Sequence, residues 1–380
     1  MKKNTKKAVI KKLDNGTMVV IDSDGNEWVD LTIGIDLGDK TSAYCVLENG
    51  SGNKILEGKV KTTREAFKKE FGAFPPARVA MEVGSHSRWA SQVVARLGHK
   101  VIVANPRELK AITGSTRKND RTDAEMLARL ARADVKLLRP IRHRGEDVQA
   151  DLTIIRARCA LVEARTKLVN AVRGLVKASG SRIKACPTEQ FTQQANEQMP
   201  ESLRPALAPL LEQIDHASEQ IDYYDRLVEQ LAETKYPETK RLSQVRGVGA
   251  LTALTFVLTL EEPGRFQRSR DVGCYVGLRP KQQQSGDSNP QLRITKAGDV
   301  YLRQLLVSCG HYILGPFGTD CHLRQWGARL AGQGGKNAKK RAVVAVARKL
   351  AVLLHRLWVS GDVYDPMRGY EVVATAAAAK

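Results

Sequence analysis

Apolar residues in the first third of the chain recur in short runs that alternate with helical patterns. The candidate strands are the apolar runs at 31–36, 42–47, 77–82 and 100–104, with a further short run at 135–138. Apolar residues at helical spacing mark the segments 62–71, 86–97 and 120–133. Short antiparallel strands followed by strand–helix units predict a mixed sheet with helices on its faces.

The first thirty residues form a separate pattern. Turn signals at 14–16 and 24–26 separate short β-like runs such as 17–21, which predicts a small hairpin. Six lysines lie in this extension. Contact with nucleic acid and a solvated basic tail both account for them.

The middle of the chain reads as two long, charged helices. Apolar residues recur at helical spacing through 145–178 and 201–235, and the polar segment 179–200 joins them. This pattern predicts an antiparallel helical pair, which could be a spacer, a dimer surface or a brace for nucleic acid, with its apolar stripes forming core or oligomer contacts. The predicted division is an N-terminal extension, an α/β domain, the helical region, a mostly helical C-terminal domain and a tail, at 1–30, 31–144, 145–239, 240–365 and 366–380.

Charge narrows the class of partner. The chain has 61 Lys and Arg against 41 Asp and Glu, a formal net charge of +20 and a pI near 9.8. This excess indicates a polyanionic partner, with nucleic acid ahead of an anionic membrane surface. No run approaches the roughly 20 apolar residues of a membrane-spanning helix. The six cysteines show no CxxC or zinc spacing, so free thiols in a reducing cytoplasm are expected.

Four carboxylates occupy positions where burying a charge would be costly. Asp36 and Glu82 each end an apolar run, and Asp120 and Asp123 share the face of the 120–133 helix that carries Leu127. Carboxylates at the ends of buried strands are costly unless something positive meets them. Oxygen ligands in such a cluster suit Mg²⁺, with Mn²⁺ as the alternative, acting on a phosphate backbone.

Other interpretations of these acids remain open. Asp120 or Thr122 could cap the helix, and each acid could form a surface ion pair. Residues 35–38 also resemble the first phosphate loop of actin-like ATPases and sugar kinases. The second phosphate loop and the adenosine motif of those folds are missing from the sequence.

The polar segment 281–290 contains Ser285 beside the flexible Gly286. A serine attacks phosphorus only when its proton is removed and the phosphate charge is neutralised. Cations are close in sequence but a base is not, so composition alone favours an ordinary loop serine. The neighbouring cations are Arg279, Lys281, Arg293 and Lys296.

Two further segments could meet phosphate. Residues 245–249, Val-Arg-Gly-Val-Gly, could present backbone N–H groups and a helix N-terminus to phosphate, or could simply form a tight turn. The predicted last helix, 337–359, carries Lys339, Lys340 and Arg341 near its start. These three are candidate nucleic-acid contacts, although a solvated face accounts for them equally well.

The order of these motifs resembles the DEDD transposases of IS110-type insertion sequences, including the IS1111 subgroup. The resemblance covers roughly residues 31–365. The matching segments are 34–36, 81–85, 118–124, 245–249, 277–280 with 285–286, and 296–303.

The resemblance implies a RuvC-like N-terminal domain with an RNase H type fold, in which Asp36, Glu82, Asp120 and Asp123 hold Mg²⁺. It also implies that Ser285 forms a covalent phosphoserine link to DNA. Ser288 is the alternative nucleophile, but Ser285 stands at the family's position. A noncoding bridge RNA would pair with target and donor DNA, and the protein would assemble from dimers into a tetramer, in the cytoplasm at the nucleoid of a bacterial or archaeal cell.

Three classes of function therefore compete. The first is an RNA-guided DNA recombinase that uses the metal site and Ser285. The second is a RuvC-like nuclease in which the acids activate water. The third is a non-catalytic nucleic-acid-binding protein.

Overall fold

The structure is a computed structural model. It describes residues 30–105, 119–286, 288–290 and 292–368, and the backbone of 9–12, 18–21 and 27–28. The chain forms two compact units, Met1–His143 and Arg144–Lys380. Among these described residues, no helix is long and apolar enough to cross a membrane. Most of the predicted 366–380 tail and the lysines of the predicted extension lie outside the described side chains.

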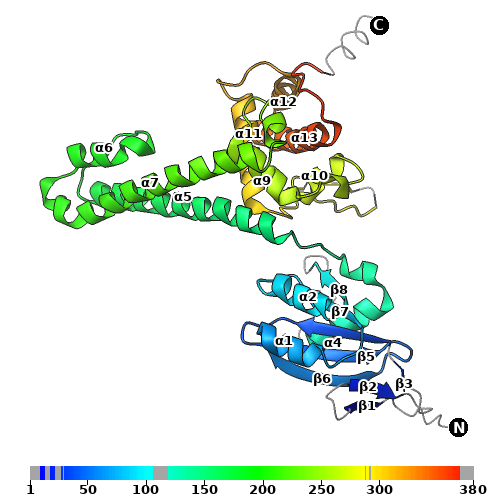
Figure 1. Ribbon diagram of the computed structural model, residues 1–380. Coiled ribbons are helices and arrows are strands. Elements are labelled where there is room, and N and C mark those ends of the chain that lie inside the picture. Colours follow the sequence, from blue (N-terminus) through cyan, green and yellow to red (C-terminus); the bar gives the residue numbers. More distant parts are fainter. Residues whose placement is uncertain are drawn as a thin grey trace, which may run out of the picture. The chain divides into compact units, whose positions relative to one another are not determined.

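A five-stranded mixed sheet, in the order β6-β5-β4-β7-β8, forms the centre of the first unit (Figure 1). The strands are β4 (Leu31–Asp36), β5 (Thr41–Glu48), β6 (Lys54–Lys61), β7 (Arg78–Glu82) and β8 (Lys100–Ala104). β4, β5 and β6 pair antiparallel, whereas β4, β7 and β8 pair parallel. The prediction of a mixed sheet with helices is confirmed.

Helices cover both faces of this sheet. On one face, α1 (Arg64–Phe71) and α2 (Ser87–Arg96) pack on Ile33 and Ile35 of β4. On the other face lies α4 (Asp120–Ala133), whose alanines pack on the alternate residues of β5. Because successive side chains of a strand point to opposite faces, Gly34 and Asp36 are on the α4 side of β4.

A glycine allows α4 to lie close to the sheet. A Cβ atom at Gly34 would come within 2.0 Å of the Ala124 carbonyl oxygen and 2.5 Å of the Ala128 nitrogen. Farther along the helix, the Ala131 carbonyl accepts a 2.9 Å hydrogen bond from Arg78, the first residue of β7. The helix therefore runs antiparallel to β4 and β7, and its N-terminus lies at the edge where those strands end.

Two local predictions need correction. β6 was not expected, because its sequence mixes charged residues with few apolar ones, and only Val60 along it is buried. Pairing with β5 makes it an exposed edge strand, where charged residues are usual. The candidate strand at 135–138 is instead the 3₁₀ helix η1 (Val135–Leu138), which the Asp134 side chain caps by accepting from the Lys136 N–H.

The predicted N-terminal hairpin is present in the described backbone. β1 (Val9–Lys12) and β2 (Met18–Ile21) pair antiparallel, and β3 (Glu27–Trp28) adds a short third strand.

The second unit contains the predicted antiparallel helical pair, α5 (Glu146–Ala178) and α7 (Arg204–Thr234), which lie side by side in Figure 1. Early residues of α5 pack on late residues of α7, as Ile155 does on Val228. Arg158 forms a 2.6 Å ion pair with Asp225. Near the far end of the pair lie η2 (Thr188–Gln190), α6 (Phe191–Gln198) and η3 (Glu201–Leu203), and α6 packs on both long helices there.

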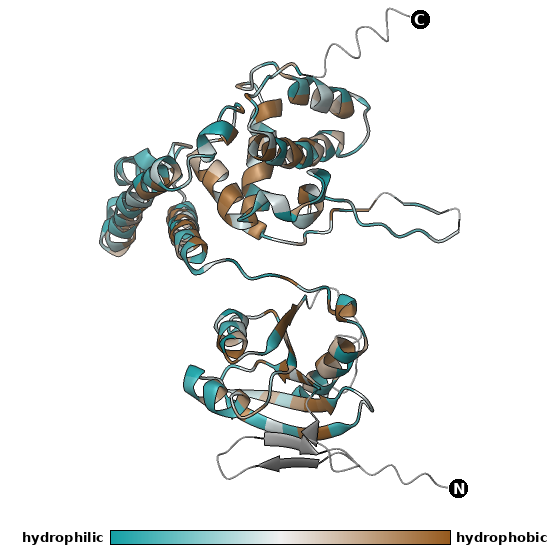
Figure 2. Ribbon diagram, turned by 45° about the vertical axis from the view of Figure 1, so that its right-hand side comes forward, coloured by the Kyte–Doolittle hydropathy of each residue, from teal (hydrophilic) through white to brown (hydrophobic). Residues whose placement is uncertain are grey.

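The rest of this unit is a helical cluster around one apolar core (Figure 2). It contains α8 (Thr239–Leu242), α9 (Ala250–Leu260), η4 (Pro263–Arg265), α10 (Arg270–Tyr275), α11 (Val300–Leu314), α12 (His322–Gly332) and α13 (Ala338–Ser360). All six cysteines of the chain are free thiols, and Cys45, Cys309 and Cys321 are buried.

Candidate active site

Asp36 and Glu82 lie at the ends of adjacent parallel strands. Ile35 of β4 is paired with Met81 of β7, so the next residue of each strand is an acid. Neighbouring strands are about 4.8 Å apart. Gly34 and Ala80 precede the acids on the α4 face, and strand alternation puts both carboxylates on that face too. Both acidic residues are partly buried.

The first turn of α4 brings the other two acids to the same edge. Asn119 is the N-cap, and its side chain accepts a 3.0 Å hydrogen bond from the Arg121 N–H. The alternative in which Asp120 or Thr122 caps this helix is therefore wrong. Asp123 is partly buried and Asp120 is exposed, and the positive end of the helix dipole favours both carboxylates here.

The electrostatics link all four side chains. The pKa of Asp36 is raised from 3.8 to about 6, first by burial and then by the negative charges of Asp120, Asp123 and Glu82. Like charges raise a carboxyl pKa only over short distances, which agrees with the strand and helix positions that bring the four acids to one edge. Lys59 lies beside this group, with its Nζ 3.7 Å from Asp120 Oδ2.

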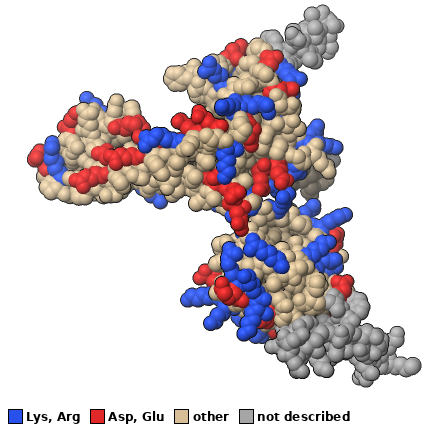
Figure 3. Space-filling view, viewed as in Figure 1, with Lys and Arg blue, Asp and Glu red and all other residues tan. Residues whose placement is uncertain are grey.

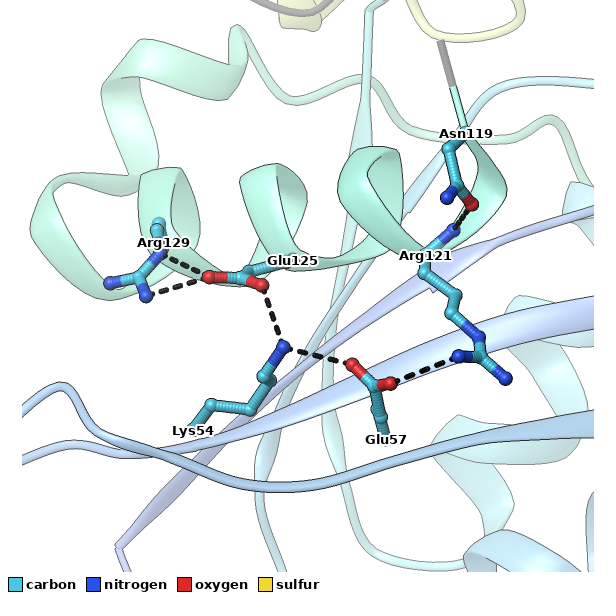
Figure 4. Close-up of polar contacts among 6 residues, drawn as sticks. All are labelled: Lys54, Glu57, Asn119, Arg121, Glu125 and Arg129. Atoms are coloured by element: carbon cyan, nitrogen blue, oxygen red, sulfur yellow. Dashed lines mark hydrogen bonds and ion pairs between the residues drawn. The ribbon is translucent and has the colours of Figure 1, made fainter. Parts of the chain in front are cut away.

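Glu125, on the same helix, has a different environment (Figure 4). Its carboxylate contacts Arg129 at 2.7 Å and Lys54 at 3.1 Å. These contacts, the hydrogen bond from Arg129 above all, lower its pKa. Glu57, beside Lys54, also pairs with Arg121 at 3.3 Å. Glu125 is thus neutralised by its own cations, in contrast to Asp36.

The chemistry of this acidic edge suits a divalent metal. Carboxylate oxygens are preferred ligands of Mg²⁺, and a dication would offset the burial and the repulsion that together raise the pKa of Asp36. Over the described ranges of the chain, however, no three His, Cys, Asp or Glu side chains are close enough together to hold a metal ion as they stand. Asp36, Glu82, Asp120 and Asp123 would need to draw together to coordinate one.

Ser285 lies in the second unit, on a polar hairpin that extends from the helical cluster (Figure 2). Pro280 and Ile294 form a bridge near its base. At the tip, the N–H of Ser285 donates to the Ser288 carbonyl at 3.1 Å, and the N–H of Ser288 returns a bond of 3.0 Å. Gly286, with φ of +54°, allows the turn between them. Both serines are exposed.

Buried contacts hold the base of this hairpin in place. Arg303 of α11 is 8% exposed and donates to the carbonyls of Val276 at 3.0 Å and Ala297 at 2.7 Å. Gly277 and Gly298 both have φ of +73°, and a Cβ at either would come within 2.1 Å of backbone oxygen from the opposite arm. The two arms therefore approach too closely for side chains at these glycines.

The predicted nucleic-acid contacts occupy different places in the second unit. Arg293, Lys296, Lys340 and Arg341 line one cavity, and Arg279 lines another. Lys281 and Lys339 are exposed and line neither. On the faces seen in Figure 3, basic and acidic side chains are interspersed along the helical pair, and basic ones predominate on the first unit.

The glycine segment 245–249 joins α8 to α9. Gly247 has φ of +92°, and a Cβ there would meet the Tyr312 ring at 2.6 Å. Val245 and Val248 are buried in the helical core. This packing accounts for the glycine and the valines as parts of a tight turn, and whether the turn also binds phosphate stays a prediction.

Sequence reasoning missed three residues that position the predicted site. Gly34 sets the distance between α4 and the sheet, and a glycine inside an apolar strand is a signal of close backbone approach. Arg303 anchors the hairpin, and its position between the core residues Leu302 and Leu306 was the available signal. Lys59 pairs with Asp120 from β6, the strand that was not expected.

Two family models match the chain. One, named for the DEDD transposases of IS110 and described as a transposase, matches residues 33–179. The other, described as the transposase IS116/IS110/IS902 family, matches residues 239–314. The first match contains Asp36, Glu82, Asp120 and Asp123, and the second contains Ser285.

Whole-chain relatives agree with these matches. The transposase for insertion sequence element IS1328 of Yersinia enterocolitica is 29% identical over 339 residues, which cover 88% of this chain and 98% of that protein. The transposase for IS1111A of Coxiella burnetii is 27% identical over 339 residues, covering 87% and 90%. With two models of one family matched in order along the sequence, the chain belongs to the IS110 family of transposases, enzymes that cut and transfer DNA strands.

Proposed function

We propose that the protein is an RNA-guided DNA recombinase that cuts and rejoins strands of an insertion sequence and its target. In this proposal the first unit is a RuvC-like domain whose four acids hold Mg²⁺ or Mn²⁺, and Ser285 is the nucleophile. The observation that carries it is the meeting of the four acids at one edge of the first unit, where Asp36 and Glu82 end the paired strands β4 and β7 and Asp120 and Asp123 begin α4.

The positions of the four acids support a single site rather than a chance grouping of charges. Two of them end adjacent strands and two begin the helix that packs on those strands. An arrangement that keeps like charges together costs stability, which is typical of functional sites. When bound by these carboxylates, a divalent ion would supply positive charge to the phosphate in the transition state.

The serine step is a transesterification, which exchanges one phosphodiester linkage for another. Ser285 Oγ forms a bond to phosphorus as a DNA P–O bond breaks, and the serine proton passes in sum to the leaving hydroxyl oxygen. The DNA stays bound as a phosphoserine ester, which a DNA hydroxyl can later attack to rejoin strands. The exposed hairpin tip supports this role, since a phosphate can approach the hydroxyl without displacing core residues.

Guide RNA and oligomerisation complete the proposal. A bridge RNA would choose target and donor by base pairing, so the protein would bind mainly phosphates, as its net charge of +20 suits. A dimer or tetramer is supported by Leu175 and Tyr223 of the helical pair, large apolar side chains that are 50% and 49% exposed. Mass measurement by light scattering, with and without Tyr223→Ser, tests that surface.

The proposed nucleophile has a matched control in its own turn. Purified protein, guide RNA and a labelled DNA substrate are incubated with Mg²⁺, and adducts that survive denaturant are separated by gel. We expect Ser285→Ala to abolish the adduct, a loss of at least about 1,000-fold for a missing nucleophile. Ser288→Ala, which alters the other exposed serine of the same turn, should retain it within a few-fold.

The same assay separates the alternatives. If Ser288→Ala abolishes the adduct and Ser285→Ala does not, the nucleophile is Ser288. Strand cleavage by Ser285→Ala without any adduct would favour a nuclease that activates water through the four acids. Binding of DNA without cleavage in the wild type, with guide RNA and either metal present, would favour the non-catalytic class.

A further inference from the structure

A cavity of about 550 Å³ lies at the base of the serine hairpin. The hairpin supplies one wall through Pro280 and Ile294, and α12 and α13 supply the opposite wall. Trp326 of α12 and Val344 of α13 contribute apolar surface to its lining. The volume falls in the range of sites for small molecules, roughly 300–1,000 Å³, and is far too small for a double helix.

The charges around this cavity have one sign. Lys336, Lys340, Arg341 and Arg348 line it together with Arg293 of the hairpin, and none of its lining residues is acidic. Among the described residues, these five side chains form no ion pair with a carboxylate. A second cavity, lined by Arg279 and Arg348, also contains carboxylates, so its charge is partly compensated within the protein.

An apolar surface with an aromatic ring, lined by cations and by no acidic residue, matches a ligand that is planar at one end and anionic at the other. A nucleotide has both features, since its base stacks on aromatic rings and its phosphates attract Lys and Arg. A duplex would offer phosphates but would leave the apolar surface exposed to water. An unstacked base is therefore the better match to this lining.

We propose that this cavity receives an unpaired nucleotide of the DNA strand that Ser285 attacks. The inference rests on the proposed function, because that function brings a DNA strand to the hairpin tip. Five residue steps separate Pro280 from Ser285 and span at most about 17 Å at 3.3 Å per step. A strand bonded to Ser285 therefore passes within a few nucleotides of the cavity, where the hairpin base and α13 hold a base and its flanking phosphates.

Adjacent lysines of α13 provide the matched variants for the phosphate contact. Lys340 lines the cavity, whereas Lys339 does not, and both are exposed near the start of the helix. Binding of a fluorescent 12-nucleotide thymidylate strand is followed by anisotropy across salt concentrations. The affinity falls as salt rises, and we expect Lys340→Ala to make the slope of log affinity against log salt less steep by about 0.7. This is the value for one single-strand phosphate contact. Lys339→Ala should change the slope by less than half as much.

The base contact is tested with altered DNA on the unaltered protein. An abasic version of the same strand keeps its phosphates, and we expect it to bind at least about fivefold more weakly, as loss of stacking predicts. A strand containing 5-iodouracil should form its photo-crosslink at Trp326 or another lining residue, located by mass spectrometry.

Several results would overturn the inference. Equal effects of Lys339→Ala and Lys340→Ala, equal binding of the abasic strand, or crosslinks only outside the cavity would each do so. A uridylate strand that binds tenfold more tightly than thymidylate and crosslinks at Trp326 would assign the cavity to RNA instead. None of these assays involves cleavage, so their failure is distinct from failure of the covalent adduct.

Discussion

The structure positions Asp36 and Ser285 in different ways. Asp36 ends a central strand, next to Glu82 and under the first turn of α4, where its surroundings hold it in place and raise its pKa. Ser285 lies at the exposed tip of a polar hairpin whose rigid part is its base, where Arg303 binds backbone carbonyls. The acids are thus positioned by packing, whereas the serine is positioned by anchors several residues away.

The largest stability effect is expected where packing is tightest. Gly34→Ala would place a methyl group 2.0 Å from the Ala124 carbonyl oxygen, so α4 must move away from the sheet. We expect the free energy of unfolding of the first unit to fall by about 3 kcal/mol, as over-packing predicts. Gly84→Ala is the control, because nothing lies within 4 Å of its added Cβ. Equal urea midpoints for the two variants would contradict the packing argument.

Loss of the hairpin anchor should have a somewhat smaller effect. Arg303→Met keeps the buried stem but removes the donors to Val276 and Ala297. We expect a loss of about 2 kcal/mol from the second unit, the typical value for charged hydrogen bonds. Amide hydrogen exchange should accelerate at Lys281 and Thr295, whose N–H groups bond across the hairpin. Lys281→Met, at an exposed side chain, should leave these rates unchanged, and slow exchange in Arg303→Met would refute the anchor.

Removing the charge of Asp36 should stabilise the protein. Because the folded pKa, about 6, exceeds the ordinary 3.8, the folded state binds this proton more tightly than the unfolded chain does. The ionised carboxylate therefore costs stability above pH 6, and the cost vanishes below about pH 4. We expect Asp36→Asn to gain about 1–2 kcal/mol at pH 8 without metal, after allowance for solvent screening.

Glu125→Gln is the matched comparison for that measurement. Arg129 and Lys54 lower the pKa of Glu125, so removing its charge should reduce stability at pH 8 rather than raise it. Thermal unfolding of the wild type and both variants at pH 4 and pH 8 measures the sign of each change in stability. A destabilising Asp36→Asn at pH 8 would mean that burial and the neighbouring acids do not disfavour the ionised Asp36 carboxylate.

The smallest effect is expected at Lys59. Its ion pair with Asp120 spans 3.7 Å, and the two side chains are 50% and 65% exposed. Exposed pairs contribute less than about 1 kcal/mol. We expect Lys59→Met to unfold at nearly the wild-type urea concentration, and a large loss would show that Lys59 is needed to hold the acids together.

Much of the acidic edge could be predicted from the sequence, because it depends on local patterns. Buried strands read as apolar runs, and an acid at the end of each run marks Asp36 and Glu82. The helix of Asp120 and Asp123 shows helical spacing of its apolar residues, and its bounds were predicted as 120–133. What the pattern could not show was Asn119 as the cap, since Asn, Asp and Thr all favour that position.

The missing parts depend on contacts distant in sequence. β6 is stabilised by pairing with β5 rather than by an apolar pattern of its own. Arg303 reaches Val276, 27 positions earlier, and its place between Leu302 and Leu306 indicates burial without indicating its partner. The cavity beside the hairpin likewise joins residues 278–296 to 326–348, so only the fold brings its cations around Trp326. The single Ser285 was selected by resemblance, because composition alone does not distinguish it from Ser288.

The central claim is that the acidic edge and the serine hairpin serve one reaction, and formation of the DNA adduct by Asp36→Asn tests it most directly. With Ser285 intact, guide RNA present and Mg²⁺ added, we predict that this stably folded variant forms no denaturant-resistant adduct. We expect the same absence of adduct for the wild type when EDTA removes the metal. An adduct at Ser285 formed by Asp36→Asn at the wild-type rate would contradict the account, because the serine would then act without the acids.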